Sequence, residues 1–176
     1  QNIVSESNCI TDNSFIKTNI LVNGMFLDNN GTGDYLKYDI SDLSLSGSDF
    51  AIEMSVRGAA LKRSSGYPTL FTLTDNSTNN LCLAIYDSTN IVLQNCSTYT
   101  IYRRLIMSSI TLSSNDFYKV IVNFNQNDIK FSINSIESEY INSYTYSNKN
   151  FLFIGSTQNK DYQWNDIIDY VKIYKR

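Results

Sequence analysis

Histidine is absent from this 176-residue sequence, and the absence removes several kinds of active site at once. Nucleophilic catalysis by a Ser-His or Cys-His pair needs an imidazole base, and the usual zinc sites need imidazole ligands. Carboxylates are then the side chains left for acid–base chemistry. A catalytic site in this chain would therefore have to be built on Asp and Glu.

Proline occurs once and charged residues make up only 18% of the chain, which favours uninterrupted β-ladders. No apolar run approaches the roughly 20 residues that span a bilayer. The chain opens at Gln1 without Met or an apolar signal segment, as expected of a processed, soluble product. The net charge of -3 provides no basic surface, so we expect no nucleic acid and no membrane insertion.

Cysteine is scarce and odd in number: Cys9, Cys82 and Cys96. Cys82 and Cys96 flank an apparent hairpin, and a three-residue loop over Ser88–Asn90 would place them directly opposite each other, close enough to bridge. A loop of two or four residues would offset them by one, so a disulfide and two unpaired thiols both stay open. Cys9 would then be free for an intermolecular bond.

Three Asn-x-Ser/Thr sequons predict N-glycosylation if the chain passes through a secretory route. Their acceptors are Asn30, Asn76 and Asn95. Together with the cysteines, they favour an extracellular or cell-surface location.

What the sequence does contain is a hydrophobic pattern of period two. Phe50, Ile52, Met54 and Val56 alternate with shorter or polar residues, which predicts a half-buried strand. Further strands are expected at 20–27, 34–40, 69–74, 81–86, 91–94, 105–112, 118–124, 129–133, 151–155 and 167–174. About a dozen short strands without a convincing helix predict an all-β sandwich, with 1–176 as a single domain and 1–19 as an N-terminal extension or first strand.

The order of several segments resembles laminin-G-like domains of the concanavalin A-like lectin/glucanase superfamily. Gly33-Asp34-Tyr35-Leu36 and the stretch LSGSDFAIEMSV at 45–56 match the opening of such domains. NDFYKVIVNFNQNDIKFSIN at 115–134 resembles their central hairpin, FLFIGS at 151–156 a later strand, and IIDYVKIYKR at 167–176 the closing strand. The resemblance implies a jelly-roll β-sandwich of two curved antiparallel sheets.

Departures from the family pattern bear on activity. Glucanases of this superfamily carry an acidic Glu-x-Asp-x-x-Glu strand or a similar one, which this sequence lacks, so the resemblance implies a binding domain rather than an enzyme. Glu137 and Glu139 are the remaining catalytic candidates, because side chains two apart on one strand share a face at a spacing that glycosidases use. The alternative, which we favour, is that they charge a solvent-exposed edge strand.

The loop DNNGTGD at 28–34 matches part of a calcium-loop template, but strand-like flanks exclude the helical EF-hand version. A non-helical calcium site and a glycine-rich turn both remain; we expect the turn, no metal site and no cofactor.

Trp164 is the only tryptophan, and it lies in a polar loop before the last strand. Sugars stack on aromatic rings while amides and carboxylates bind their hydroxyls. A carbohydrate-binding lip is therefore one interpretation of Asp161, Tyr162, Trp164 and Asn165, and packing of Trp164 in the core is the other. Arg103 and Arg104, beside Tyr99 and Tyr102, form a second aromatic and basic cluster, which we expect to be a solvated loop.

These features favour a non-enzymatic extracellular module, lectin-like or adhesive, that binds glycan or a protein partner. A structural subunit of a self-assembling extracellular fibre or sheath is the alternative, supported by the odd cysteine, with a possible homo-oligomer or filament as its assembled form. A glycan hydrolase ranks third, because fold alone suggests it.

Overall fold

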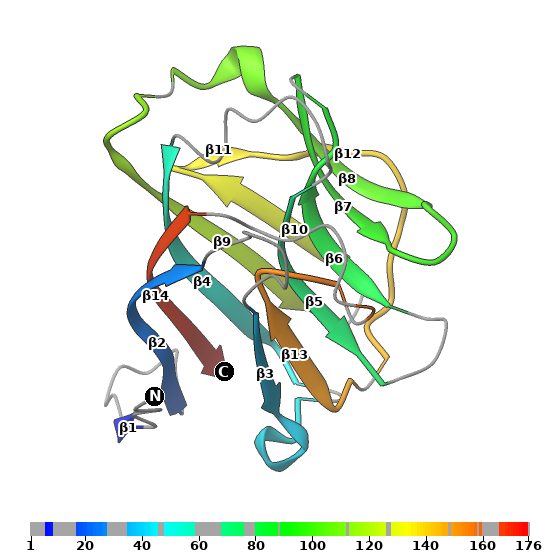
Figure 1. The fold of residues 1–176 in the computed structure, drawn as a ribbon. Coiled ribbons are helices and arrows are strands. Elements are labelled where there is room, and N and C mark those ends of the chain that lie inside the picture. Colours follow the sequence, from blue (N-terminus) through cyan, green and yellow to red (C-terminus); the bar gives the residue numbers. More distant parts are fainter. Residues whose placement is uncertain are drawn as a thin grey trace.

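The computed structural model describes residues 6–8, 17–27, 35–45, 48–58, 68–75, 80–87, 89–111, 113–125, 128–147, 149–157, 159 and 166–175, with the backbone alone for 6–8 and 17–27. The strands form two antiparallel sheets of seven strands that pack face to face (Figure 1). This confirms the predicted all-β jelly-roll sandwich.

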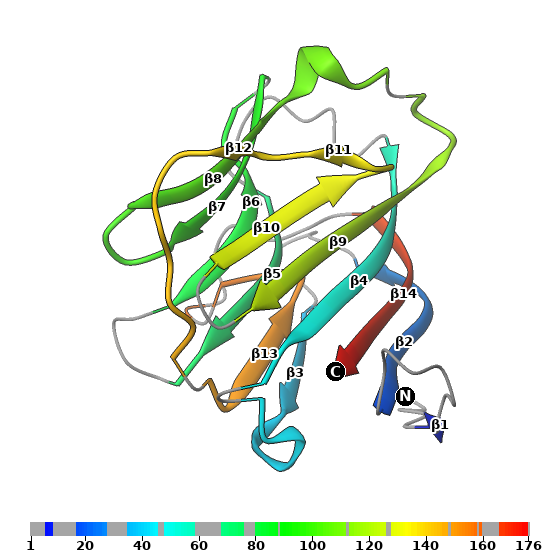
Figure 2. The ribbon, with the colours of Figure 1, turned by 180° about the vertical axis from the view of Figure 1, so that it is seen from behind.

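Sheet A has the strand order β1-β2-β14-β4-β9-β10-β11, and Figure 2 looks onto its outer side. Its strands are β1 (Glu6–Asn8), β2 (Lys17–Leu27), β4 (Phe50–Arg57), β9 (Phe117–Asn125), β10 (Asp128–Ile133), β11 (Ile136–Glu137) and β14 (Asp166–Lys175).

Sheet B has the order β12-β8-β7-β6-β5-β13-β3 and faces the viewer in Figure 1. Its strands are β3 (Leu36–Asp39), β5 (Thr69–Thr74), β6 (Leu81–Ile85), β7 (Asn90–Asn95), β8 (Ile101–Ile106), β12 (Glu139–Tyr140) and β13 (Phe151–Ile154).

The period-two pattern decides which side chains enter the core. In β9, residues 118, 120, 122 and 124 are buried, and the residues between them are exposed or half-buried. Directly opposite these four on β4 lie Val56, Met54, Ile52 and Phe50, which are buried as well. One face of each strand therefore fills the space between the sheets, and the other face stays on the outside.

The last strand lies in the middle of sheet A rather than at its edge. β14 pairs with β2 on one side and with β4 on the other, so strands from the two ends of the chain become neighbours. The predicted closing strand at 167–174 is confirmed with slightly wider bounds.

The strand predicted at 105–112 is wrong beyond Ile106. A short 3-10 helix, η2 (Met107–Ser109), follows β8, and the N–H of Ile110 donates to the carbonyl of Met107 at 3.1 Å. Met107 and Ile110 are both buried. A 3-10 turn puts residues three apart on one side, so it buries both side chains where a strand would have pointed them to opposite faces.

Candidate functional site

The outer side of sheet A, which faces the viewer in Figure 2, carries a set of side chains that we call the open face. They project from four adjacent strands, because residues directly opposite each other in a ladder share a face. One row runs Tyr174, Ala51, Asn123, Lys130; the next runs Lys172, Glu53, Ile121, Ser132; the third runs Tyr170, Ser55, Lys119.

Glu53 is at the centre of the open face, with a side chain only 13% exposed. The hydroxyl of Tyr170 donates to Glu53 Oε1 at 2.8 Å, and Lys119 Nζ lies 4.0 Å from the same oxygen. Lys172 is directly opposite Glu53, and its Nζ lies 4.3 Å above the ring centroid of Tyr170. The carboxylate is thus held within a network of donors and cations.

The two tyrosines of this network act as hydrogen-bond donors. Burial, followed by the hydrogen bond to Glu53 and its charge, raises the pKa of Tyr170 above the ordinary value. Burial and the charge of Glu53 likewise raise the pKa of Tyr174. Both phenols therefore stay protonated at neutral pH, and Tyr170 is not prepared as a nucleophile despite its contact with a carboxylate.

A hollow of about 230 Å³ adjoins the open face at Asn123, which belongs to both. Its lining also includes Asp49, Asn125, Phe50 and Phe124. The two phenylalanine rings stack with centroids 4.2 Å apart, and a third aromatic ring packs edge-on against both. Both phenylalanines are only 2% exposed, so their rings belong to the core and form a rigid floor beneath the hollow. The groups that the hollow offers to solvent are one carboxylate and two amides.

This hollow can bind hydroxyl groups. Carboxylate oxygens accept hydrogen bonds, and amides both donate and accept, which matches the paired requirements of a sugar hydroxyl. The side chains of Asp49 and Asn123 form no hydrogen bond or ion pair with any other described residue. The volume lies below the roughly 300–1,000 Å³ of pockets that enclose drug-sized ligands, so the hollow suits one sugar ring.

The predicted pair Glu137 and Glu139 does not share a strand. Glu137 pairs with Ser132 in sheet A, whereas Glu139 pairs with Arg104 in sheet B. The chain crosses from one sheet to the other at Ser138, whose N–H donates to the carbonyl of Phe131 at 2.8 Å. The premise of one shared strand face was wrong, while both glutamates do lie exposed on edge strands, as the alternative interpretation required.

The cluster at Arg103 and Arg104 was expected to be a solvated loop, and it is strand β8. Arg103 is only 1% exposed. Its guanidinium donates to the carbonyls of Tyr102 and Asn142 and forms an ion pair with Asp128 of sheet A. The ion pair joins the two sheets and the two carbonyls take up further guanidinium donors, whereas the side chain of Arg104 is 44% exposed.

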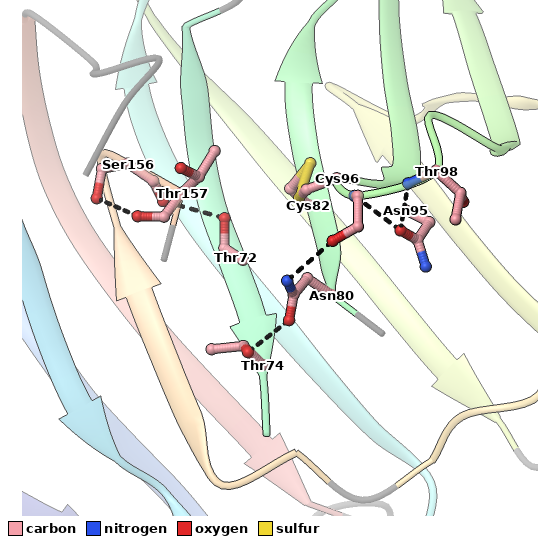
Figure 3. Close-up of a disulfide and its surroundings, with 10 residues drawn as sticks. Thr72, Thr74, Asn80, Cys82, Asn95, Cys96, Thr98, Ser156 and Thr157 are labelled. Carbon is pink, nitrogen blue, oxygen red and sulfur yellow. Dashed lines mark hydrogen bonds between the residues drawn. A yellow bond between two sulfur atoms is a disulfide. The ribbon is translucent and has the colours of Figure 1, made fainter. Parts of the chain in front are cut away.

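Cys82 and Cys96 are joined by a disulfide with a Cα–Cα distance of 5.9 Å (Figure 3). The predicted loop at Ser88–Asn90 was shifted by one residue: the N–H of Tyr86 donates to the carbonyl of Asn90, which leaves 87–89 as the loop.

The ladder of β6 and β7 accordingly has a register different from the predicted one. Gln94 lies directly opposite Cys82, and the N–H of Cys96 donates to the carbonyl of Asn80. The two cysteines are diagonal neighbours on one face of the ladder, and such neighbours are still within reach of each other.

Asn95, one of the predicted glycan acceptors, is 7% exposed. Its Oδ1 accepts hydrogen bonds from the N–H groups of Ser97 and Thr98 at 2.8 and 3.0 Å, which caps the turn after β7 (Figure 3). The structure thus gives this side chain a role in the turn, and a glycan on Asn95 stays a prediction.

Several predicted residues lie outside the described part of the chain. They are Cys9, the loop at 28–34 with Asn30, Asn76, and the lip of Asp161, Tyr162, Trp164 and Asn165. Their proposed roles remain predictions. Among the described residues, no group of three or more Asp, Glu, Cys or His gathers as a metal site would require. Within the same residues, no helix is long and apolar enough to cross a membrane.

Sequence reasoning missed the open face because it sought ligand residues in loops. The available signal was the outward half of each period-two pattern. In the last strand, Tyr170, Lys172 and Tyr174 alternate with Val171 and Ile173, and this marks an outer surface rich in aromatic and basic groups.

A family model described as "Concanavalin A-like lectin/glucanases superfamily" matches residues 30–176. No curated protein sequence matches the chain.

Solved structures with the same fold come from diverse proteins. Domain 4 of AbnA, a GH43 extracellular arabinanase from Geobacillus stearothermophilus in complex with arabinotriose, is 14% identical at a TM-score of 0.55, covering 98% of this chain and 75% of that one. The CBM40 of the Ruminococcus gnavus IT-sialidase, bound to α2,3-sialyllactose, is 13% identical at 0.58, covering 87% and 89%. Domains LG4-5 of the mouse laminin α1 chain are 9% identical at 0.57, covering 97% and 41%. At these identities, the likeness concerns the fold.

Proposed function

Because the chain belongs to the concanavalin A-like lectin/glucanases superfamily, we propose that it is a non-enzymatic extracellular module that binds glycan. The observation that carries this proposal is the hollow beside the open face, where the polar side chains of Asp49, Asn123 and Asn125 gather. Such groups suit sugar hydroxyls, which both donate and accept hydrogen bonds.

Two of the similar structures support this proposal, because each contains a bound sugar. One is in complex with arabinotriose and another is bound to sialyllactose. The sandwich can thus carry a sugar site, although the ligand of this chain has to be found from its own residues.

The arrangement of carboxylates argues against hydrolysis. Retaining and inverting glycosidases use two carboxyl groups that face each other across the bond to be cleaved. On the open face, Glu53 accepts the hydroxyl of Tyr170, and Glu137 and Glu139 belong to different sheets. We therefore propose a binding role without catalysis.

A glycan array followed by calorimetry with the strongest binder tests this proposal. Asn123→Ala and Asp49→Ala should each weaken binding about tenfold or more, since each removes a hydrogen-bonding group from the ligand. Asn115→Ala and Asp42→Ala, at exposed positions away from the hollow, are the matched controls. Equal affinity of all four variants would remove the hollow from the site.

Trp164→Ala tests the predicted lip in the same assay. Loss of binding in this variant alone would move the site to Asp161, Tyr162, Trp164 and Asn165. Mass spectrometry of the secreted protein checks for sugars on Asn30, Asn76 and Asn95.

A second proposal is that the chain is a subunit of an extracellular fibre, or adheres to a protein partner. The disulfide between Cys82 and Cys96 favours it, because Cys9 then has no cysteine left within the chain. Light scattering at high concentration under oxidising conditions tests it: concentration-dependent assembly that Cys9→Ser prevents is the expected result, and a monodisperse monomer contradicts it.

A further inference from the structure

We propose that the open face selects a negatively charged sugar, with a carboxylate or sulfate group held between Lys119 and Lys172. This inference rests on the proposed glycan-binding function and names the class of ligand. It concerns the centre of the face, and the hollow binds a neighbouring, uncharged part of the same ligand.

The first argument is the position of the two lysines. Lys172 projects from β14 and Lys119 from β9, the two strands that flank β4. Strands in a sheet are about 4.8 Å apart and successive outward residues about 6.8 Å apart, so the two Cα atoms are separated by about 12 Å. Lysine side chains are long and flexible, so both ammonium groups can reach one anionic group placed above Glu53.

The second argument is a count of donors and acceptors. Glu53 is the acceptor at the centre of the face, but its side chain is 13% exposed and receives the hydroxyl of Tyr170. Lys119, with a side chain 54% exposed, and Lys172 carry donors alone. A ligand at this point therefore has to supply acceptors, and a charged acceptor forms the stronger hydrogen bond to an ammonium group.

The remaining charges leave this centre positive toward a ligand. Arg57 and Asp166 pair with each other at 2.7 Å. Of the exposed carboxylates, Glu137 lies on edge strand β11, opposite Ser132, and Asp169 lies next to Tyr170, where its negative charge offsets part of the lysine charge. Lys130, opposite Asn123, adds a third ammonium group at the end nearer the hollow.

The distance between the hollow and the lysines sets the minimum length of the ligand. Asn123 is two residues along β9 from Ile121, which lies opposite Glu53. An uncharged ring that binds Asp49 and Asn123 thus lies one row away from the anionic group. The geometry points to an acidic sugar joined to at least one neutral sugar.

Calorimetry with lactose, sialyllactose and sulfated lactose tests the inference on the intact protein. At low salt, at least one charged ligand should bind about tenfold or more tightly than lactose, since a hydrogen bond to a charged group is worth about that factor. The difference should shrink as salt rises, because salt screens the attraction between the ligand and these solvent-accessible lysines. The charged ligand with the higher affinity shows whether the face prefers a carboxylate or a sulfate group.

Three variants separate this inference from general binding. Lys119→Gln and Lys172→Gln should each weaken binding of the charged ligand several-fold and leave the affinity for lactose unchanged. Glu53→Gln keeps the acceptor oxygen for Tyr170 and removes the negative charge, so it should strengthen binding of the charged ligand. Lys37→Gln, an exposed lysine on sheet B, is the matched control.

The outcomes distinguish the two proposals. If lactose binds as tightly as both charged ligands, or Glu53→Gln weakens the charged ligand, the inference is overturned while the proposed function stands. If no sugar binds here or on the array, the proposed function fails and the inference fails with it.

Discussion

At the scale of single residues, Arg103 shows how an ion pair can be placed to join two sheets. The guanidinium is buried on the sheet B side, and its partner Asp128 keeps 27% of its side chain exposed. Removing one partner of a buried pair is costly mainly because the other charge stays buried without compensation. The two halves of this pair should therefore respond differently to mutation.

Asp128→Ala is expected to lower the free energy of unfolding by about 3 kcal/mol or more, because it leaves Arg103 charged and buried. Arg103→Met should cost less, since Asp128 can be solvated. Urea denaturation measures both. Arg104→Met is the control, and its exposed 4.0 Å contact with Glu139 should be worth about 0.5 kcal/mol or less. The reverse order of the two main variants would contradict this account.

Tyr144 and Tyr146 form a natural pair for testing hydroxyl burial. Tyr144 is buried and its hydroxyl has no hydrogen-bond partner among the residues that the structure describes, whereas the hydroxyl of Tyr146 accepts the N–H of Lys149 at 3.2 Å. An unsatisfied buried hydroxyl costs about 1–3 kcal/mol. Tyr144→Phe should therefore raise the urea midpoint, and Tyr146→Phe should lower it. A lower midpoint in both variants would show that the hydroxyl of Tyr144 has a hydrogen-bond partner in solution.

The pH dependence of Tyr146 follows from the same burial. Burial raises its pKa from 10.0 to about 12, against the opposing effect of the Lys149 hydrogen bond. Between these values the unfolded chain has lost a proton that the folded chain retains, so the free energy of unfolding falls as the pH rises from 10 to about 12. This alkaline loss should be smaller in Tyr146→Phe, and unchanged in the control Tyr140→Phe, whose ring is 72% exposed.

At the scale of elements, the disulfide fixes the hairpin of β6 and β7. It closes a loop with a sequence separation of 14, and a loop of about 15 residues gains about 3 kcal/mol in the chain-entropy account. The paired replacement of Cys82 and Cys96 by Ala should lower the free energy of unfolding by about this amount. Cys9→Ala is the control, with no change expected in the monomer.

At the scale of the whole molecule, β14, near the C-terminal end of the sequence, pairs with β2, near its N-terminal end. It forms ladders with both β2 and β4 in the middle of sheet A. A chain that ends before Asp166 loses both of these ladders and the buried side chains of Ile168, Val171 and Ile173, so we expect it to lose its cooperative urea transition. Removal of residues 1–8, which include the short edge strand β1, should leave the transition cooperative; loss of cooperativity there would contradict this view.

The fold could be predicted because its signals are local and repeated. Alternation along each strand marks the buried face, and the order of the strands matches a known family. Register was harder: a shift of one residue in the loop near Ser88 altered every pairing of β6 with β7. Long-range contacts, such as that of Arg103 with Asp128, could not be predicted from sequence spacing. The residues of the open face could not be grouped either, because that requires the order of the strands in sheet A.

The central place of β14 also affects how the protein is made. During synthesis, Leu27 at the end of β2 precedes Asp166 at the start of β14 by 139 residues (166 − 27). At 5–20 residues per second, the ribosome needs roughly 7–28 s to close that gap. β2 is therefore made well before one of its two ladder partners, and until β14 emerges the backbone edge that will pair with it stays open to pairing with another strand.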